Sequence, residues 1–167
     1  EETRSVSYAV DKDRLKRDGP CSASFYAAGK TGAEGIVLEH PDTAEPAEVP
    51  AGRYDVVVAC ASTEGALAST VQVDARKANV SKKVRLRPAF LLVNVTRDGK
   101  EVPAEIVVTD ASGHEVQRGR DKVALPVPPG KLSVLARLEK KVSGRPILGA
   151  LSVVTREGKK LVEVVDT

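Results

Sequence analysis

The stretch that decides the fold is VPAGRYDVVVAC at positions 49–60, because it recurs as VPPGKLSVLARL at positions 127–138. In both copies Val-Pro-x-Gly leads into a long run of mostly apolar residues. Pro followed closely by Gly is typical of a turn, and the run after it is typical of a β-strand. The two copies begin 78 residues apart, which indicates an internal repeat.

Two further landmarks recur in the same order. The triplet Arg-Asp-Gly stands at 17–19 and again at 97–99, an offset of 80 residues. Segments 69–86 and 149–165 resemble each other in pattern, though not in identity. A nearly constant offset predicts two homologous modules of roughly 80 residues, 1–87 and 88–167, joined near Arg87-Pro88.

Composition favours strands in both modules. Val is present in 26 copies, whereas aromatic residues make up only 3% of the chain. β-Branched side chains suit a pleated surface, and no segment keeps an apolar period of 3.6 over three turns. We predict an all-β fold of two tandem Greek-key β-sandwich modules, each with about seven short antiparallel strands. In the second module the strands are expected at 89–95, 104–108, 114–117, 122–127, 131–138, 147–154 and 160–165.

The order of these features resembles a known group of modules. An opening strand, an Asp-Gly turn, an Ala-x-Ile/Phe-x-Val strand and then Val-Pro-x-Gly-x-Tyr-x-Val-x-Val are similar to bacterial PEGA and carboxypeptidase-regulatory-like modules, which are transthyretin-like or Cna-B-like sandwiches. PAGRYDVVV at 50–58 is the best match, and the second module departs from it with Leu132 in the place of Tyr54. The resemblance implies non-enzymatic spacer or binding units at bacterial envelopes and surfaces.

Charge and hydropathy exclude several classes of protein. The net charge of +3 arises from 26 basic and 23 acidic residues, which is typical of a solvated surface and not of a nucleic-acid binder. No apolar run approaches the roughly 20 residues of a membrane-spanning helix. There is no signal-peptide pattern and no Met, so we expect a processed or trimmed chain.

The sequence offers no catalytic or cofactor-binding constellation, so we expect no enzyme activity and no cofactor. His40 and His114 are the two histidines, and both are expected in solvent-facing loops. No phosphate-binding loop, nucleophile elbow or zinc ligand set is present. Asp11, Asp13 and Asp18 form the one candidate calcium site, but basic residues between them favour a solvated linker, and we predict no metal.

Basic residues gather on one predicted strand near the end of the first module. Lys83, Arg85 and Arg87 alternate with Val84 and Leu86, so the basic side chains share one face. Lys82 adds to the charge, but no aromatic residue stands nearby to stack on a nucleic-acid base. We interpret the stripe as the solvated face of an edge strand.

Two functions from different classes fit these features. The first is a structural or interaction module pair of a bacterial envelope or surface protein, with a spacer, adhesion or assembly role. It would bind another envelope protein through edge strands or through the loops at 40–48 and 139–146. The alternative is a carbohydrate-binding accessory domain of a secreted enzyme, for which Tyr8 and Tyr26 are the spare aromatic residues.

The resemblance also implies how the two cysteines lie. Cys21 opens one strand and Cys60 closes another, and in the implied topology these strands are antiparallel neighbours. We therefore expect a disulfide between Cys21 and Cys60 and a periplasmic or cell-surface location. By the repeat, Cys21 matches Val102 and Cys60 matches Leu138, both apolar. Two buried thiols in a reducing compartment are the alternative.

Overall fold

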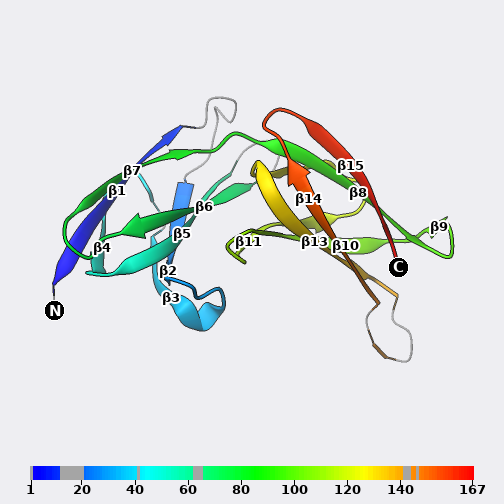
Figure 1. Cartoon of the computed structure of the whole chain (residues 1–167), viewed down its shortest axis with the longest axis horizontal. Helices are drawn as coiled ribbons and strands as arrows, with labels where there is room; N and C mark the ends of the chain where they lie inside the picture. Colours follow the sequence, from blue (N-terminus) through cyan, green and yellow to red (C-terminus); the bar gives the residue numbers. More distant parts are fainter. Residues whose placement is uncertain (1, 12–20, 41, 62–65, 141–143, 146) are drawn as a thin grey trace. The chain divides into compact units, whose positions relative to one another are not determined.

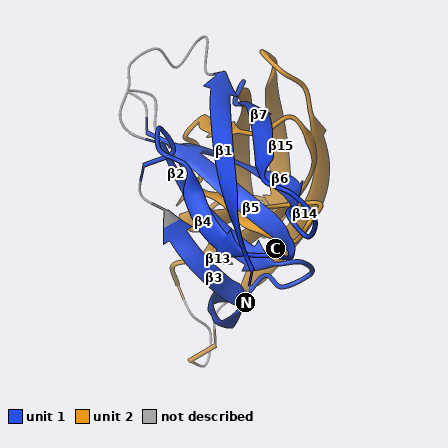
Figure 2. Ribbon diagram, turned by 90° about the vertical axis from the view of Figure 1, so that its left-hand side faces the viewer, with its two compact units in different colours: residues 1–87 blue, residues 88–167 orange. Residues whose placement is uncertain are grey.

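The computed structural model describes residues 2–11, 21–40, 42–61, 66–140, 144–145 and 147–167. Contacts between Cα atoms divide the chain into two compact units, residues 1–87 and residues 88–167. Figure 2 shows unit 1 in blue and unit 2 in orange. The boundary lies between Arg87 and Pro88, and independent folding of the two units remains a prediction.

The described residues of unit 1 form seven strands in two sheets, which can be followed in Figure 1. One sheet has the order β4-β1-β7 and the other the order β3-β2-β5-β6. A short 3₁₀ turn at Ala33–Gly35 precedes β3. The strands are β1 (Thr3–Asp11), β2 (Cys21–Ala27), β3 (Ile36–His40), β4 (Ala47–Pro50), β5 (Arg53–Cys60), β6 (Leu67–Asp74) and β7 (Val80–Arg85).

Unit 2 repeats this succession and adds one short strand, β9. Its sheets have the orders β12-β8-β15, with β9 also paired to β8, and β11-β10-β13-β14. The fold is therefore all-β, as predicted, with two sheets in each unit. The strands are β8 (Ala89–Arg97), β9 (Lys100–Glu101), β10 (Ala104–Asp110), β11 (Glu115–Arg120), β12 (Leu125–Val127), β13 (Gly130–Leu138), β14 (Leu148–Thr155) and β15 (Lys160–Asp166).

One strand pair in each unit differs from the predicted antiparallel pairing. The first and last strands of unit 1, β1 and β7, are parallel, and so are β8 and β15 in unit 2. Period-two alternation reports which residues face the core. It carries no information on the direction of the neighbouring strand, so the sequence could not reveal these pairs.

The core of unit 1 combines aliphatic side chains with three aromatic rings. The rings of Phe25 and Tyr54 meet edge to face with centroids 5.7 Å apart, and the ring of Tyr8 lies 6.2 Å from Phe25. Edge-to-face contacts of this kind stabilise beyond the area that they bury. Val6 from one sheet and Val56 and Val58 from the other are fully buried in the same cluster.

The core of unit 2 is aliphatic. Leu132 on β13 lies opposite the last residue of β10, as Tyr54 on β5 lies opposite the last residue of β2. The place of the aromatic ring is thus taken by leucine. Alternate residues of β8 are buried, in the expected period of two. The buried hydrophobic residues include Leu91, Val93, Val95, Ile106, Val108, Val134 and Leu138.

The Asp98-Gly99 turn joins β8 to β9 as a two-residue hairpin. Both residues have positive φ, 54° for Asp98 and 77° for Gly99. This combination belongs to the turn type whose twist matches that of the flanking strands, and Asp-Gly is a favoured pair for it. The strand β9 itself was not predicted, because two residues are too few to show alternation.

Long apolar helices are absent from the part of the chain that the structure describes. No helix there has the length and hydropathy to cross a membrane.

Candidate interaction surface

Cys21 and Cys60 are joined by a disulfide in unit 1. The two residues lie directly opposite each other on the antiparallel pair β2 and β5, with Cα atoms 4.1 Å apart. Both are buried within the core cluster. The bond links the start of β2 to the end of β5 and encloses the chain between them.

The equivalent pair in unit 2 differs from the one that the sequence repeat indicates. Ala104 on β10, and not Val102, lies opposite Leu138 on β13. The amide of Val102 instead donates to the carbonyl of Val95 on β8, so Val102 still belongs to the β8–β9 hairpin. The extra hairpin strand displaces the alignment by two residues. Ala104 and Leu138 are both buried and pack where unit 1 is cross-linked.

His114 is buried, contrary to the expectation of a solvent-facing loop. Only 2% of its surface is exposed, because the turn that precedes it folds the chain back onto β10. The Asp110 carboxylate accepts a hydrogen bond from the amide of His114 at 3.1 Å, and the carbonyl of His114 accepts one from the amide of Asp110 at 3.0 Å. His40, the other histidine, was also expected in a loop, but it is the last residue of the strand β3.

The candidate calcium ligands do not form a site that the structure describes. Asp13 and Asp18 lie outside the described residues, and Asp11 forms an ion pair with Arg87 at 3.0 Å. Among the residues that are described, no group of three or more His, Cys, Asp or Glu side chains is placed to hold a metal ion.

The basic stripe lies on an edge strand, as predicted. The strand β7 is at the end of the sheet β4-β1-β7. Val84 and Leu86 are buried, whereas Lys83 and Arg85 are exposed. This confirms the alternation and leaves the charge in solvent.

The spare tyrosines are not arranged as an exposed aromatic platform. Tyr8 packs against the core of unit 1 beside Phe25, and Tyr26 is half-buried. The two candidate loops are described in part only, since residues 41, 141–143 and 146 lie outside the described residues.

The outer face of the sheet β11-β10-β13-β14 carries a patch of uncharged side chains on three of its strands. Strand register aligns Val107 with Leu135 and Ala150 in one row. The same register aligns Thr109 with Ser133 and Ser152 in the next row. The residues that alternate with these on β10 and β13 are buried, so the two rows face outward. We call these six residues the β13 face.

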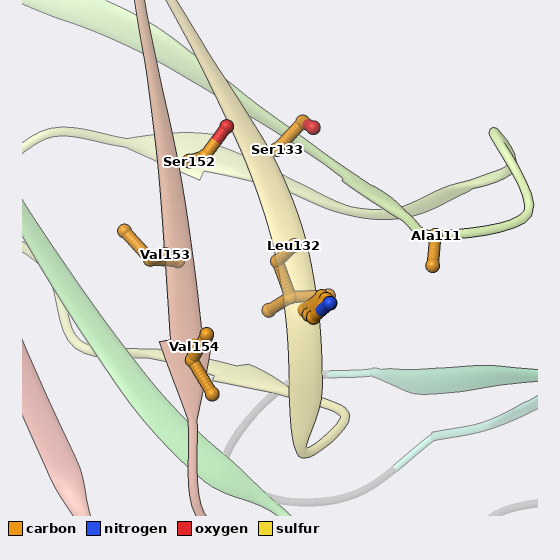
Figure 3. A pocket seen from close by; sticks show the side chains of 7 residues that line it. Ala111, Leu132, Ser133, Ser152, Val153 and Val154 are labelled. Atoms are coloured by element: carbon orange, nitrogen blue, oxygen red, sulfur yellow. The ribbon is translucent and has the colours of Figure 1, made fainter.

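Two of the shallow grooves formed by the described residues lie on this face. One, of about 450 Å³, runs beside Ser133, Ser152 and Val154, and Figure 3 shows these side chains on the neighbouring strands β13 and β14. A second, of about 360 Å³, lies over Val107, Leu135 and Ala150. Small-molecule sites are usually enclosed clefts lined by a few convergent polar groups. Open grooves on a sheet suit a flat macromolecular surface better.

Ion pairs border the β13 face along β11. Arg118 bonds Glu115 at 2.6 Å and Glu105 at 2.8 Å, and Arg120 bonds Glu139 at 2.5 Å. The Glu115 carboxylate raises the pKa of Arg118, so this guanidinium stays charged. A third groove, of about 560 Å³, lies among these charged residues. An uncharged centre with a charged rim is the usual arrangement of a protein-binding surface.

Sequence reasoning did not identify the β13 face. Its members stand far apart in the chain and carry no motif, and they come together only through strand register. The one available signal is that the outward positions of the strand 131–138 include Ser133 and Leu135, where a solvated strand usually carries charge.

Comparisons with known proteins show neither a family nor a named relative. No family model matches the chain, and no curated protein matches it. Among solved structures, the Bacillus anthracis TIE protein is similar over 98% of this chain, with 16% identity and a TM-score of 0.38. This chain spans 33% of that protein's length.

Two further solved structures are similar over most of their own length. One is a Bacteroides ovatus protein described as an adhesin, with 10% identity, a TM-score of 0.34 and coverage of 99% of this chain and 93% of that one. The other is a Bacteroides fragilis protein described as a cell adhesion protein, with 13% identity, a TM-score of 0.30 and coverage of 98% and 89%. Similarity at this level assigns neither a family nor a function to the chain.

Proposed function

We propose that this chain is a pair of non-enzymatic modules in a bacterial envelope or surface protein, similar to PEGA and carboxypeptidase-regulatory-like modules, and that it binds another envelope protein through the β13 face. The observation that carries the proposal is the composition of that face. Its centre has apolar and hydroxyl side chains in register, and its border has ion pairs.

Binding is favoured over catalysis by the chemistry of the hydroxyl groups. Ser133 and Ser152 lie opposite each other on the β13 face. A serine nucleophile needs an adjacent base that is itself oriented by a third group. The residues that line the grooves beside the two serines include one ionisable side chain, Lys131, and no histidine or carboxylate. The hydroxyl groups are therefore suited to donate and accept hydrogen bonds with a partner.

An extracytoplasmic location is supported by the disulfide. Structural disulfides persist in oxidising compartments and are rare in the bacterial cytosol. The Cys21–Cys60 bond is buried in the core of unit 1, so folding and oxidation are coupled there.

A binding experiment with two matched variants tests the proposal. Ser133→Arg places a long charged side chain at the centre of the β13 face, and Asn94→Arg places the same side chain on β8, in the other sheet of unit 2. Wild-type protein is incubated with solubilised envelope protein of the source organism, and retained proteins are identified by mass spectrometry. We expect Ser133→Arg to weaken retention roughly tenfold or more, as central interface substitutions do, and Asn94→Arg to leave it unchanged.

Three outcomes would contradict the proposal. These are an absence of retained protein, equal binding by both variants, and loss of binding in Asn94→Arg alone. Retention on a polysaccharide array in place of protein would favour the alternative, a carbohydrate-binding accessory domain.

A further inference from the structure

The strand β14 is an unusual end strand. It lies at the end of the sheet order β11-β10-β13-β14, and no described strand pairs with its other side. Its eight residues, LGALSVVT, include no charged residue and no Pro. An end strand of this kind presents a row of unpaired backbone groups to another strand.

Half of the residues in β14 direct their backbone groups to the free side. The amide of Leu138 donates to the carbonyl of Ile147 at 3.0 Å, so these two form a hydrogen-bonded pair. Bonded and non-bonded pairs alternate along an antiparallel ladder. Gly149, Leu151 and Val153 therefore bond to β13. The amides and carbonyls that point to the free side belong to Leu148, Ala150, Ser152 and Val154.

The other end strands of the four described sheets are protected against such pairing. The strand β7 carries Lys83 and Arg85, and β11 carries Arg118 and Arg120. Each of the others has at least one charged residue or Pro: Glu39 in β3, Glu48 in β4, Asp74 in β6, Pro126 in β12 and Glu163 in β15. Charged residues and Pro on an edge discourage strand addition. The edge of β14 lacks both.

The outward side chains of β14 are symmetric about Leu151. Leu148 and Val154 stand three residues before and after it, and they are 50% and 61% exposed. Ala150 and Ser152, both small, lie directly beside it. The order large, small, small, large reads alike in both directions.

We propose that β14 pairs antiparallel with β14 of a second copy of this chain, about a two-fold axis at Leu151. In this register Leu148 of each copy lies opposite Val154 of the other, and Ala150 of each copy lies opposite Ser152 of the other. The backbone amides and carbonyls of Leu148, Ala150, Ser152 and Val154 in each copy then bond to the other copy, which gives about eight backbone hydrogen bonds. Two four-stranded sheets become one continuous sheet, the usual form of strand addition.

Symmetry favours a second copy over an unrelated strand. A two-fold interface uses the same patch on both partners, so the patch must be complementary to itself. The edge of β14 meets this condition, because its exposed apolar residues fall on each other and no like charges are opposed. The proposal deepens the proposed function by naming one binding partner, and it rests on the view that these sheets act as interaction surfaces.

Sedimentation equilibrium of the whole chain with three double variants tests the pairing. Leu148→Glu/Val154→Glu places like charges opposite each other twice across the axis. Within one copy, position 148 lies opposite Arg137 and position 154 opposite Lys131, so the glutamates do not strain the monomer. Leu148→Glu/Val154→Lys opposes unlike charges in the same places. Val162→Glu/Val164→Glu is the control, because these β15 residues are 54% and 56% exposed and belong to the other sheet of unit 2.

We expect the wild type to form a dimer at or below about 1 mM. The Glu/Glu variant at 148 and 154 should dimerise roughly tenfold more weakly or worse, and the Glu/Lys variant should return to within about threefold of the wild type. The β15 control should match the wild type. Circular dichroism confirms that each variant is folded.

A wild type that stays monomeric up to about 1 mM would overturn the inference. The inference would also be overturned if the Glu/Glu variant dimerised as strongly as the wild type, or if the Glu/Lys variant dimerised as weakly as the Glu/Glu variant. These results concern purified protein alone. Envelope binding is tested separately with Ser133→Arg and Asn94→Arg, so the two proposals can fail independently.

Discussion

Cys21 on β2 lies directly opposite Cys60 on β5, and the disulfide between them joins two neighbouring strands within the core of unit 1. The bridge connects residues 39 positions apart in the sequence. Closing a loop of that length limits the unfolded chain, which is the main way in which a disulfide stabilises a fold. Unit 1 is therefore expected to depend on its redox environment.

Removing the bridge should destabilise unit 1. We expect Cys21→Ala/Cys60→Ala to lower the free energy of unfolding of unit 1 by about 3–4 kcal/mol, measured by urea denaturation. Thiol titration of the unfolded wild-type protein without reductant should find no free thiol. Two free thiols would contradict the bridge and weaken the envelope assignment with it.

A second bridge can be built at the matching place in unit 2. Ala104 and Leu138 are cross-strand partners, as Cys21 and Cys60 are, so Ala104→Cys/Leu138→Cys should oxidise spontaneously. Val102→Cys/Leu138→Cys is the control, because Val102 bonds to β8 and not to β13. Non-reducing mass spectrometry should find a disulfide in the first variant only. A bridge in the control alone would show that the sequence repeat, and not the strand register described above, gives the correct equivalence.

Loss of the hydroxyl group should have different effects on stability at two tyrosines in the core of unit 1. The Tyr54 hydroxyl donates to the carbonyl of Pro50, so Tyr54→Phe should cost about 1 kcal/mol of stability. The Tyr8 hydroxyl is buried and has no hydrogen-bond partner among the described residues, so Tyr8→Phe should leave stability unchanged or raise it. Urea denaturation of both variants is the measurement, and equal losses would contradict this difference.

The same Tyr8 hydroxyl should make unit 1 sensitive to alkali. Burial raises the pKa of Tyr8 above its ordinary value of 10.0, because the folded protein disfavours the charged phenolate. Above that ordinary value the unfolded chain releases a proton that the folded chain retains, so stability falls as pH rises. Tyr8→Phe should remove this part of the fall between about pH 9 and 11. An identical decline in wild type and variant would speak against it.

Each unit should fold alone. Fragments 1–87 and 88–167 are expected to give dispersed amide NMR spectra whose peaks overlay those of the whole chain. Their stabilities should be modest, roughly 3–5 kcal/mol each, because a domain of this size buries a small core. Disorder of both fragments beside a stable whole chain would mean that the two units share one core.

The strands of unit 2 were largely predictable from its sequence. Alternation and turn residues predicted both ends of β8, β10, β13, β14 and β15 to within two residues. This was possible because one face of each strand is buried, and hydrophobic periodicity indicates that face directly. The features that escaped depend on contacts between strands. They are the parallel pairs and the burial of His114. The strand β9 was missed because two residues are too few to show alternation.

The interaction surface escaped for the same reason. Val107, Ser133 and Ala150 stand on three strands and share no local pattern. The uncharged outward positions Ser133 and Leu135 are a weak signal, because one strand alone does not show which residues lie beside it. The position of β14 at the end of its sheet could not be predicted either, because an uncharged apolar run is as typical of a buried strand as of an exposed end strand.

The most direct test of the account uses a photo-crosslinking amino acid at Ser133, at the centre of the β13 face, in the protein expressed in its source organism. The same amino acid at Asn94, on the other sheet of unit 2, is the control. Crosslinks to a second copy of this chain are identified by mass and counted separately from crosslinks to other proteins. We predict that position 133 crosslinks to a protein of the cell envelope and that position 94 does not. No crosslink from position 133, or the same products from both positions, would contradict the claim that the β13 face binds an envelope protein.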